Sequence, residues 1–146
     1  MDVLPTIVGL TKTKLPTNAI DGVDIISLLT GQPNANPRDH FVYYYDNNSL
    51  KAVRQGVWKL VFAHQSQTYK ATDMGKDGFP GKYASVAVPM ALYDLSTDPG
   101  ETLDVAKHNP AVLAALNAIA DIYRTELGDD LTNKPGTQKR PAATIQ

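Results

Sequence analysis

The sequence predicts an α+β fold, in which a small antiparallel sheet of about four strands packs against a long C-terminal helix. The middle of the chain holds runs of β-branched and aromatic residues separated by turn residues, beginning at 41–45. Residues 110–127 then carry apolar side chains at helical spacing. The 146 residues, 42% of them hydrophobic and 20% charged, suffice for one domain with a buried core.

Four runs of strand-forming residues make up the predicted sheet. They are Phe41–Tyr45, Leu50–Arg54, Val57–Ala63 and Met90–Leu95. Gln55-Gly56 separates the second run from the third, which indicates a tight hairpin. Residues 65–88 are rich in Gly and Lys and weakly patterned, so they are predicted to form a long excursion between the third and fourth strands.

The helix has clear signals at both ends. Asn109 is a favourable N-cap residue, Pro110 occupies the first helical position, and Gly128 is a typical stop. One face carries Val112, Leu113, Leu116, Ile119, Ala120, Tyr123 and Leu127. A helix of about 17 residues is about 25 Å long, which is enough to lie across a small sheet.

The regions before and after this body have a different composition. Residues 1–40 are expected to form a separate segment with short helices at 2–10 and 25–29, for which Asp2 and Asp24 are the N-caps. Residues 41–128 contain the sheet and the helix. Residues 129–146 are polar, include two prolines, and are predicted to be an extended tail.

Composition excludes several classes of function. The chain has 14 Lys+Arg against 15 Asp+Glu, so a net charge of −1 argues against nucleic acid or an anionic membrane as partner. It has no cysteine, which removes disulfides, thiolate metal sites and cysteine nucleophiles. No apolar run approaches the roughly 20 residues that span a bilayer. Met1-Asp2 does not begin a signal-peptide pattern, so no targeting segment is expected and the compartment stays open.

The three histidines are candidates for chemistry. His40, His64 and His108 are far apart and none belongs to a His-x-x-x-His pair, so no metal site is expected. His64 follows the third predicted strand and opens a polar segment, where a side chain is well placed to meet a ligand. An exposed loop histidine with no ligand is the other interpretation of this residue.

No catalytic residue is predicted from the remaining motifs. Four acidic residues, Asp94, Asp98, Glu101 and Asp104, lie close together in sequence. Pro99 interrupts the spacing of a calcium loop, so a solvated turn is the better interpretation. The chain contains no Gly-x-Ser-x-Gly nucleophile motif and no glycine-rich phosphate loop.

Four motifs nevertheless occur in a recognisable order. They are Asp2-Val3-Leu4-Pro5-Thr6, Ile20-Asp21-Gly22-Val23-Asp24-Ile25 with Leu28-Leu29-x-Gly31, Ala52–Leu60, and Leu92–Glu101. Together they resemble the C-terminal part of the sulfatase family, the formylglycine-dependent sulfuric ester hydrolases. The segments 64–69 and 75–83 resemble the bacterial arylsulfatase branch, as do Leu127-Gly128-Asp129, Gly136 and Arg140-Pro141.

The resemblance carries expectations about function. Complete members of the family have a large N-terminal domain with Cys- or Ser-x-Pro-x-Arg, whose first residue becomes formylglycine, and with calcium ligands. This sequence contains neither the Cys-x-Pro-x-Arg nor the Ser-x-Pro-x-Arg form of the motif. The resemblance therefore implies a C-terminal arylsulfatase subdomain that is not catalytic by itself and has no cofactor of its own. Its partner would be a missing N-terminal catalytic domain with calcium and formylglycine. The parent family is often periplasmic or secreted.

The resemblance also implies where substrate would lie. In the family this subdomain packs on the large domain and its loops help wall the substrate pocket. His64 resembles a loop histidine of this branch and is expected to bind substrate, which would be a sulfated small molecule or glycan. The alternative is a stand-alone accessory module that binds sulfated glycans without hydrolysis, against which the absence of excess positive charge argues. A fragment with no present role is a third possibility.

Self-association is a further expectation. If residues 1–30 normally pack on a large domain, the chain alone should expose apolar side chains and tend to associate with itself. The side chains concerned are Leu4, Ile7, Leu10, Ile25 and Leu28.

Overall fold

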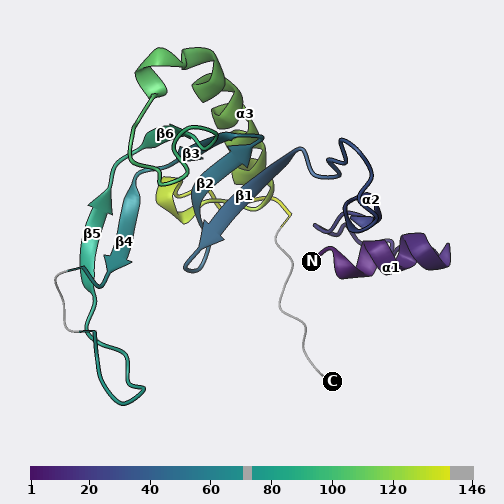
Figure 1. Cartoon of the computed structure of the whole chain (residues 1–146), viewed down its shortest axis with the longest axis horizontal. Coiled ribbons are helices and arrows are strands. Elements are labelled where there is room, and N and C mark those ends of the chain that lie inside the picture. Colours follow the sequence, from purple (N-terminus) through teal and green to yellow (C-terminus); the bar gives the residue numbers. More distant parts are fainter. Residues whose placement is uncertain (71–73, 139–146) are drawn as a thin grey trace. The chain divides into compact units, whose positions relative to one another are not determined.

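The computed structural model describes residues 1–70 and 74–138, and it divides the chain into two compact units, Met1–Asp39 and His40–Gln146. The first unit contains helices α1 (Val3–Thr11) and α2 (Ile26–Leu29). The second contains the strands, the helix α3 and two short 3₁₀ turns (Figure 1). None of the helices among the described residues combines the length and the apolar character that crossing a bilayer requires.

The first unit is held together by polar contacts from α1. Asp2 occupies the predicted N-cap position of α1, but its side chain does not cap the helix, because the carboxylate accepts a hydrogen bond from the Val23 amide at 2.9 Å and pairs with Arg38. That amide hydrogen bond, together with Arg38, lowers the pKa of Asp2. The Ile25 amide donates to Thr6 Oγ1 at 3.1 Å. Four of the apolar side chains expected to be exposed are exposed, namely Leu4, Ile7, Leu10 and Leu28.

The second unit is built on a four-stranded antiparallel sheet in the order β1-β2-β3-β6. Its strands are β1 (His40–Tyr45), β2 (Ser49–Gln55), β3 (Trp58–Val61) and β6 (Ala91–Asp94). The pairing Gln55↔Trp58 confirms the predicted hairpin, and Gly56 at φ +57° supplies the left-handed residue that its turn requires. The sheet confirms the predicted fold class.

Helix α3 (Pro110–Glu126) packs against one face of this sheet (Figure 1). The shared core is apolar and comprises Leu50, Val53, Leu60, Phe62, Leu92, Leu116 and Ala120. The predicted extent and buried face of the helix are confirmed. Asn109, however, forms no side-chain cap, because its amide instead donates to the Val105 carbonyl at 3.0 Å.

A second, two-stranded sheet begins at His64 and ends at Val88, where the sequence predicts only a long excursion over 65–88. Strands β4 (His64–Thr68) and β5 (Ala84–Val88) pair antiparallel and extend away from the four-stranded sheet (Figure 1). We call this pair the arm. Both of its faces are largely solvent-accessible, so the alternation of apolar and polar residues that reveals a strand is missing.

The start of the predicted tail is ordered and packed. Asp129 is completely buried, and residues Asp130–Thr132 form the 3₁₀ turn η2. The carboxylate of Asp129 accepts hydrogen bonds from the amides of Leu50 and Leu131 and pairs with Arg124 at 3.0 Å. The structure therefore differs from an extended chain over 129–138, and residues 139–146 lie outside the described residues.

Candidate functional site

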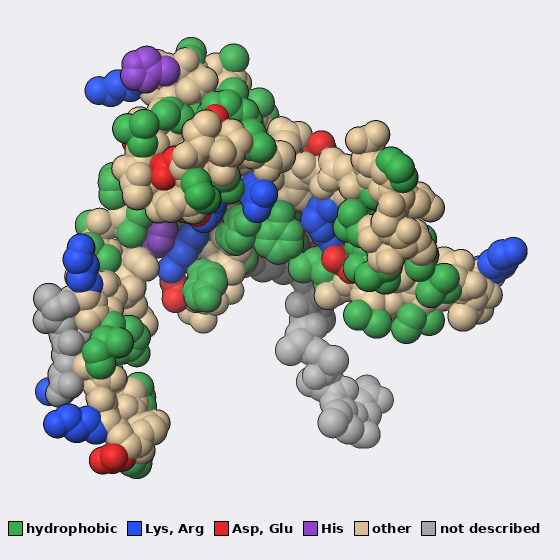
Figure 2. Space-filling model, viewed as in Figure 1, with side chains coloured by type: hydrophobic (Ala, Val, Ile, Leu, Met, Phe, Trp, Pro, Cys, Tyr) green, Lys and Arg blue, Asp and Glu red, His purple; other side chains and the backbone are tan. Residues whose placement is uncertain are grey.

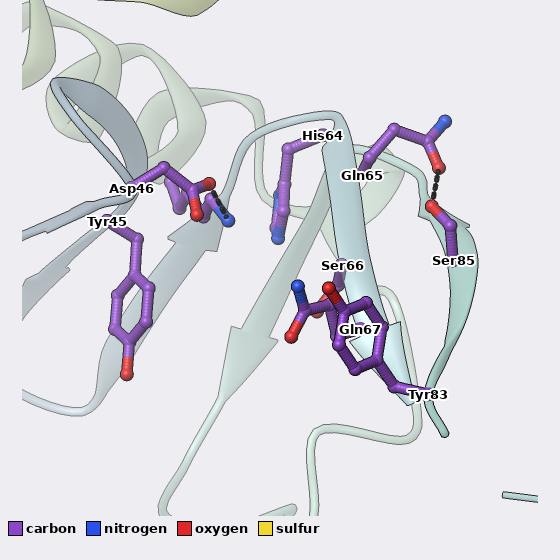
Figure 3. Close-up of a pocket in the computed structure, with 9 residues that line it drawn as sticks. Tyr45, Asp46, His64, Gln65, Ser66, Gln67, Tyr83 and Ser85 are labelled. Atoms are coloured by element: carbon purple, nitrogen blue, oxygen red, sulfur yellow. Dashed lines mark hydrogen bonds and ion pairs between the residues drawn. The ribbon is translucent and has the colours of Figure 1, made fainter. Parts of the chain in front are cut away.

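A pocket of about 610 Å³ lies between the turn that joins β1 to β2 and the arm. Its lining is Tyr45, Asp46, Lys51, His64, Gln65, Ser66, Gln67, Tyr83 and Ser85. The volume is in the range of small-molecule sites. Figure 3 shows Tyr45 and Asp46 on one side and Gln67 and Tyr83 on the other, with His64 between them.

His64 is the one residue that the sequence proposed for substrate, and it lines this pocket. It is the first residue of β4 rather than a loop residue, and its side chain is partly buried. The imidazole Nδ1 lies 2.7 Å from the Phe62 carbonyl oxygen. Because a carbonyl only accepts, Nδ1 carries the proton, and Nε2 is left as the ring atom that can meet a ligand.

Lys51 reaches the pocket because of an irregularity in β2. Tyr43 pairs with Ala52 and Tyr44 with Leu50, so Lys51 is the extra residue of a β-bulge. A bulge turns a side chain away from the direction that regular alternation would give it. Leu50 and Val53 then both belong to the core packed against the helix, while Lys51 lines the pocket.

The ammonium of Lys51 has two neighbours at the pocket. It pairs with the carboxylate of Asp46 at 2.7 Å and lies 5.4 Å from the centre of the Tyr45 ring. The Lys51 side chain is 15% exposed and that of Asp46 is 66% exposed. The cation is therefore the more sheltered partner, and water screens mainly the carboxylate.

The arm supplies the neutral polar side of the pocket. Ser85 Oγ donates to the Gln65 side-chain oxygen at 3.1 Å, which leaves the Gln65 amide nitrogen as a donor (Figure 3). Tyr83 is 56% exposed and packs edge-on against Tyr69 with ring centres 6.5 Å apart. As far as the described residues go, the lining thus offers hydroxyl and amide groups and two aromatic rings, but no Ala, Val, Leu or Ile side chain.

The other histidines lie elsewhere in the second unit. His40 Nε2 is 3.0 Å from the Tyr123 hydroxyl, a contact that joins β1 to α3. His108 is exposed in the 3₁₀ turn η1 (Ala106–His108). Among residues 1–70 and 74–138, no three His, Asp or Glu side chains come together as metal ligands.

The carboxylates of the acidic cluster stabilise turns by accepting hydrogen bonds from nearby backbone amides. The carboxylate of Asp98 accepts from the amides of Thr102 and Leu103, and that of Asp104 accepts from the amides of Leu92 and Ala106. These backbone hydrogen bonds favour the charged form and lower the pKa of both carboxyl groups. Glu101 pairs with Lys59 at 2.6 Å.

Sequence reasoning missed most of the pocket. The sequence predicts Tyr45 and Lys51 in two successive strands, Asp46 in the turn between them, and Gln67 and Tyr83 in an unpatterned excursion. The turn residues 46–49 were the available signal for the first group, since loops at strand ends often carry ligand contacts. Nothing in a single sequence indicates that this turn faces the arm.

Known proteins are similar to this chain in sequence and in fold. The family model described as the C-terminal region of aryl-sulfatase matches residues 36–144. Human arylsulfatase A is 31% identical over 147 residues, which covers 96% of this chain and 29% of the human protein. The chain belongs to the sulfatase family. It corresponds to the C-terminal region of arylsulfatase-like proteins.

Bacterial and eukaryotic sulfatases both match. The N-acetylgalactosamine-6-O-sulfatase of Bacteroides thetaiotaomicron is 28% identical over 129 residues, covering 86% of this chain and 23% of that protein. This sulfatase chain thus spans about a quarter of the length of such relatives. Because the relatives come from both kinds of organism, a place in the bacterial branch stays a prediction.

Solved sulfatase structures match as well. The structure BT33336S-sulf, described under the metabolism of multiple glycosaminoglycans by Bacteroides thetaiotaomicron, gives a TM-score of 0.59 at 26% identity and covers 86% of this chain and 24% of that one. The PsFucS1 sulfatase from Pseudoalteromonas sp. gives a TM-score of 0.62 at 14% identity, covering 91% and 26%. The second likeness is one of fold alone.

Proposed function

We propose that this chain completes the fold of a sulfatase and forms one wall of its substrate pocket, with His64 contacting the substrate. Catalysis, the cleavage of a sulfuric ester, then belongs to an N-terminal domain and not to these residues. The observation that carries the proposal is that His64, picked out by its resemblance to a sulfatase loop histidine, lines the pocket between the sheet and the arm. A ligand-sized pocket with converging polar groups is the usual form of a binding site.

The chemistry of sulfate-ester cleavage does not fit the residues present. Formylglycine derives from Cys or Ser in a Cys- or Ser-x-Pro-x-Arg motif, and the chain has neither motif. A calcium ion needs several oxygen ligands together, and the described residues bring no such group of acidic side chains together. We assign both formylglycine and calcium to the N-terminal domain.

The first unit is the part that would pack on that domain. The exposed apolar side chains of α1, Leu4, Ile7 and Leu10, would be covered there. Without the domain, the same surface favours association between copies of the chain. Light scattering over a hundredfold concentration range tests this: a mass that rises with concentration is expected, and a constant monomer mass contradicts it.

The decisive experiment joins the chain to an N-terminal sulfatase domain encoded upstream of it. With calcium and 4-nitrophenyl sulfate, we expect no turnover from the 146 residues alone and turnover from the joined protein. His64→Ala should raise KM with a smaller change in kcat, because it removes a substrate contact. His108→Ala is the matched control, since His108 is an exposed histidine outside the pocket lining.

Two results contradict the proposal. Turnover by the chain alone would locate the chemistry within these residues. An upstream reading frame without a Cys- or Ser-x-Pro-x-Arg segment would favour the alternative, a stand-alone module that binds sulfated glycans without hydrolysis.

A further inference from the structure

On the basis of the proposed function, in which His64 contacts the substrate, we infer that Arg124 is a positioning residue for His64. It acts through Phe62 and keeps the imidazole in the form that presents an unprotonated Nε2 to the pocket. Arg124 lies in the last turn of α3 and outside the pocket lining, so its effect on the pocket has to pass through another residue. Phe62 is that residue, because it contacts both Arg124 and His64.

The backbone of Phe62 is fixed at the point where the chain passes from β3 to β4. Its amide donates to the carbonyl of Lys51, the bulged residue of β2, at 2.9 Å. Its carbonyl accepts from Nδ1 of His64 at 2.7 Å. The strength of a hydrogen bond falls steeply with a poorer angle or a longer distance. The bond to His64 therefore depends on where the Phe62 backbone is held.

The ring of Phe62 is anchored from the helix. Phe62 is 7% exposed and belongs to the core that α3 shares with the four-stranded sheet. The guanidinium of Arg124 lies over this ring, with its central carbon 4.3 Å from the ring centre. A guanidinium that stacks on an aromatic face attracts it, and the attraction is stronger where water is excluded. Arg124 thus fixes the residue whose carbonyl holds His64.

The guanidinium of Arg124 is itself held in place. Its Nε donates to the carboxylate of Asp129 at 3.0 Å, and Asp129 is completely buried. Its Nη1 donates to Asp121 at 3.2 Å. The Arg124 side chain is 11% exposed, so little water competes for these hydrogen bonds. The plane of the guanidinium is therefore set by the end of α3 and not by the pocket.

These contacts determine what the imidazole of His64 offers to a ligand. Because Nδ1 carries the proton, Nε2 is a hydrogen-bond acceptor. Figure 3 shows the imidazole directed into the space between Asp46 and Gln67. Figure 2 shows an opening between the arm and the region of β1 and β2 on this face of the molecule. A ligand that enters the pocket thus meets an acceptor that is already oriented, and it can donate an O–H or N–H group to it.

The protonated nitrogen of His64 can be identified in the 146-residue chain by NMR. Two-bond ¹H–¹⁵N correlation spectra at about pH 8.5, where an imidazole is ordinarily neutral, distinguish the Nδ1–H form from the Nε2–H form. We expect the Nδ1–H form in the wild type and an about fivefold rise in the Nε2–H form in Arg124→Lys. Lysine keeps a cation beside Asp129 but has no planar group to stack on Phe62.

Phe62→Leu is the second variant, because it keeps an apolar side chain in the core but removes the aromatic face. It should give the same rise in the Nε2–H form as Arg124→Lys. An unchanged imidazole in both variants overturns the inference. A change in Phe62→Leu alone overturns the role of Arg124.

Asp104→Ala controls for a general loss of stability. It removes the acceptor of two backbone amides, those of Leu92 and Ala106, and leaves the contacts between Arg124 and Phe62 in place. The Nδ1–H form of His64 should persist in this variant. A rise in the Nε2–H form as large as that in Arg124→Lys would assign the effect to stability and contradict the positioning role.

Kinetics of the joined enzyme provide a second test. Arg124→Lys should raise KM for 4-nitrophenyl sulfate about threefold with little change in kcat. In a protein that already carries His64→Ala, Arg124→Lys should raise KM no further, because Arg124 acts by way of His64. Additive effects of the two substitutions on KM would contradict the inference, since a merely structural role of Arg124 would not depend on His64.

The proposed function and the positioning role fail differently. If His64→Ala leaves KM of the joined enzyme unchanged, the substrate contact is wrong, while the NMR measurement on the chain still decides the role of Arg124. If His64→Ala raises KM but the imidazole is the same in Arg124→Lys as in the wild type, the substrate contact stands and only the positioning role is wrong.

Discussion

The sheet with α3 and the arm are both antiparallel β-structures of the same unit, yet they are stabilised very differently. The first buries Leu50, Leu60 and Leu92 to 0% exposure beneath a helix. The arm pairs β4 only with β5, and residues 84–87 of β5 are all exposed. An isolated two-stranded ribbon is marginally stable in water. The pocket therefore has one firm wall, with Tyr45 and Lys51, and one wall that opens easily.

The largest effect on stability is expected at Asp129, the buried carboxylate between the four-stranded sheet and the end of α3. Asp129→Ala leaves the amides of Leu50 and Leu131 without their acceptor and the Arg124 guanidinium without its buried partner. The free energy of unfolding should fall by about 4 kcal/mol. Urea denaturation measures it. Asp130→Ala is the neighbouring control, because Asp130 is exposed, and a loss below about 1 kcal/mol for Asp129→Ala contradicts the prediction.

The second largest loss of stability is expected at the contact between helix α3 and the four-stranded sheet. Leu116 is 1% exposed in the centre of the core, and Leu116→Ala removes its contacts and leaves a cavity. A loss of about 3 kcal/mol is expected from thermal or urea unfolding. Leu103→Ala serves for comparison, since Leu103 is 63% exposed. Similar losses for the two leucines would mean that α3 does not bury Leu116 as described.

A smaller, pH-dependent effect is expected at Asp104. Hydrogen bonds from the amides of Leu92 and Ala106 lower its pKa below the ordinary value of 3.8. A carboxyl group whose pKa is lower in the folded state stabilises the fold above its unfolded pKa, and this contribution disappears as the pH falls through the folded pKa. The difference in stability between the wild type and Asp104→Ala should therefore be greater at neutral pH than at about pH 3. A difference that is the same at both pH values refutes this role.

The smallest effect is expected in the arm. Val86 is 43% exposed on β5, so Val86→Ala should change the free energy of unfolding of the unit by less than about 0.5 kcal/mol. Hydrogen exchange completes the comparison: the amides of β4 and β5 should exchange faster than those of β2 and β3. Equal protection in the two sheets would mean that the arm unfolds together with the core.

Local sequence patterns were sufficient to predict the helix and strands that bury one regular face. Pro110 and the helical spacing of Leu113, Leu116 and Ala120 determine α3, and the runs of β-branched and aromatic residues determine the four strands of the main sheet. The arm escaped prediction because a strand exposed on both faces has no alternation to detect. Asp2 and Asn109 occupy the predicted N-cap positions, but their side chains do not cap the helices, because they bond to the Val23 amide and the Val105 carbonyl instead.

The candidate site likewise has one part that the sequence predicts and another that depends on the tertiary structure. A resemblance in the sequence was enough to single out His64 and the sulfatase family, because short motifs preserve the chemistry of a turn or strand end. The partners of His64 depend on the folded chain: the bulge turns Lys51 toward Asp46 and Tyr45, and the arm brings Gln67 and Tyr83 opposite them. The sequence by itself determined the secondary structure of the core and the family. Only the tertiary structure decided which polar side chains share the pocket, because strand register and long-range packing place residues together that are far apart along the chain.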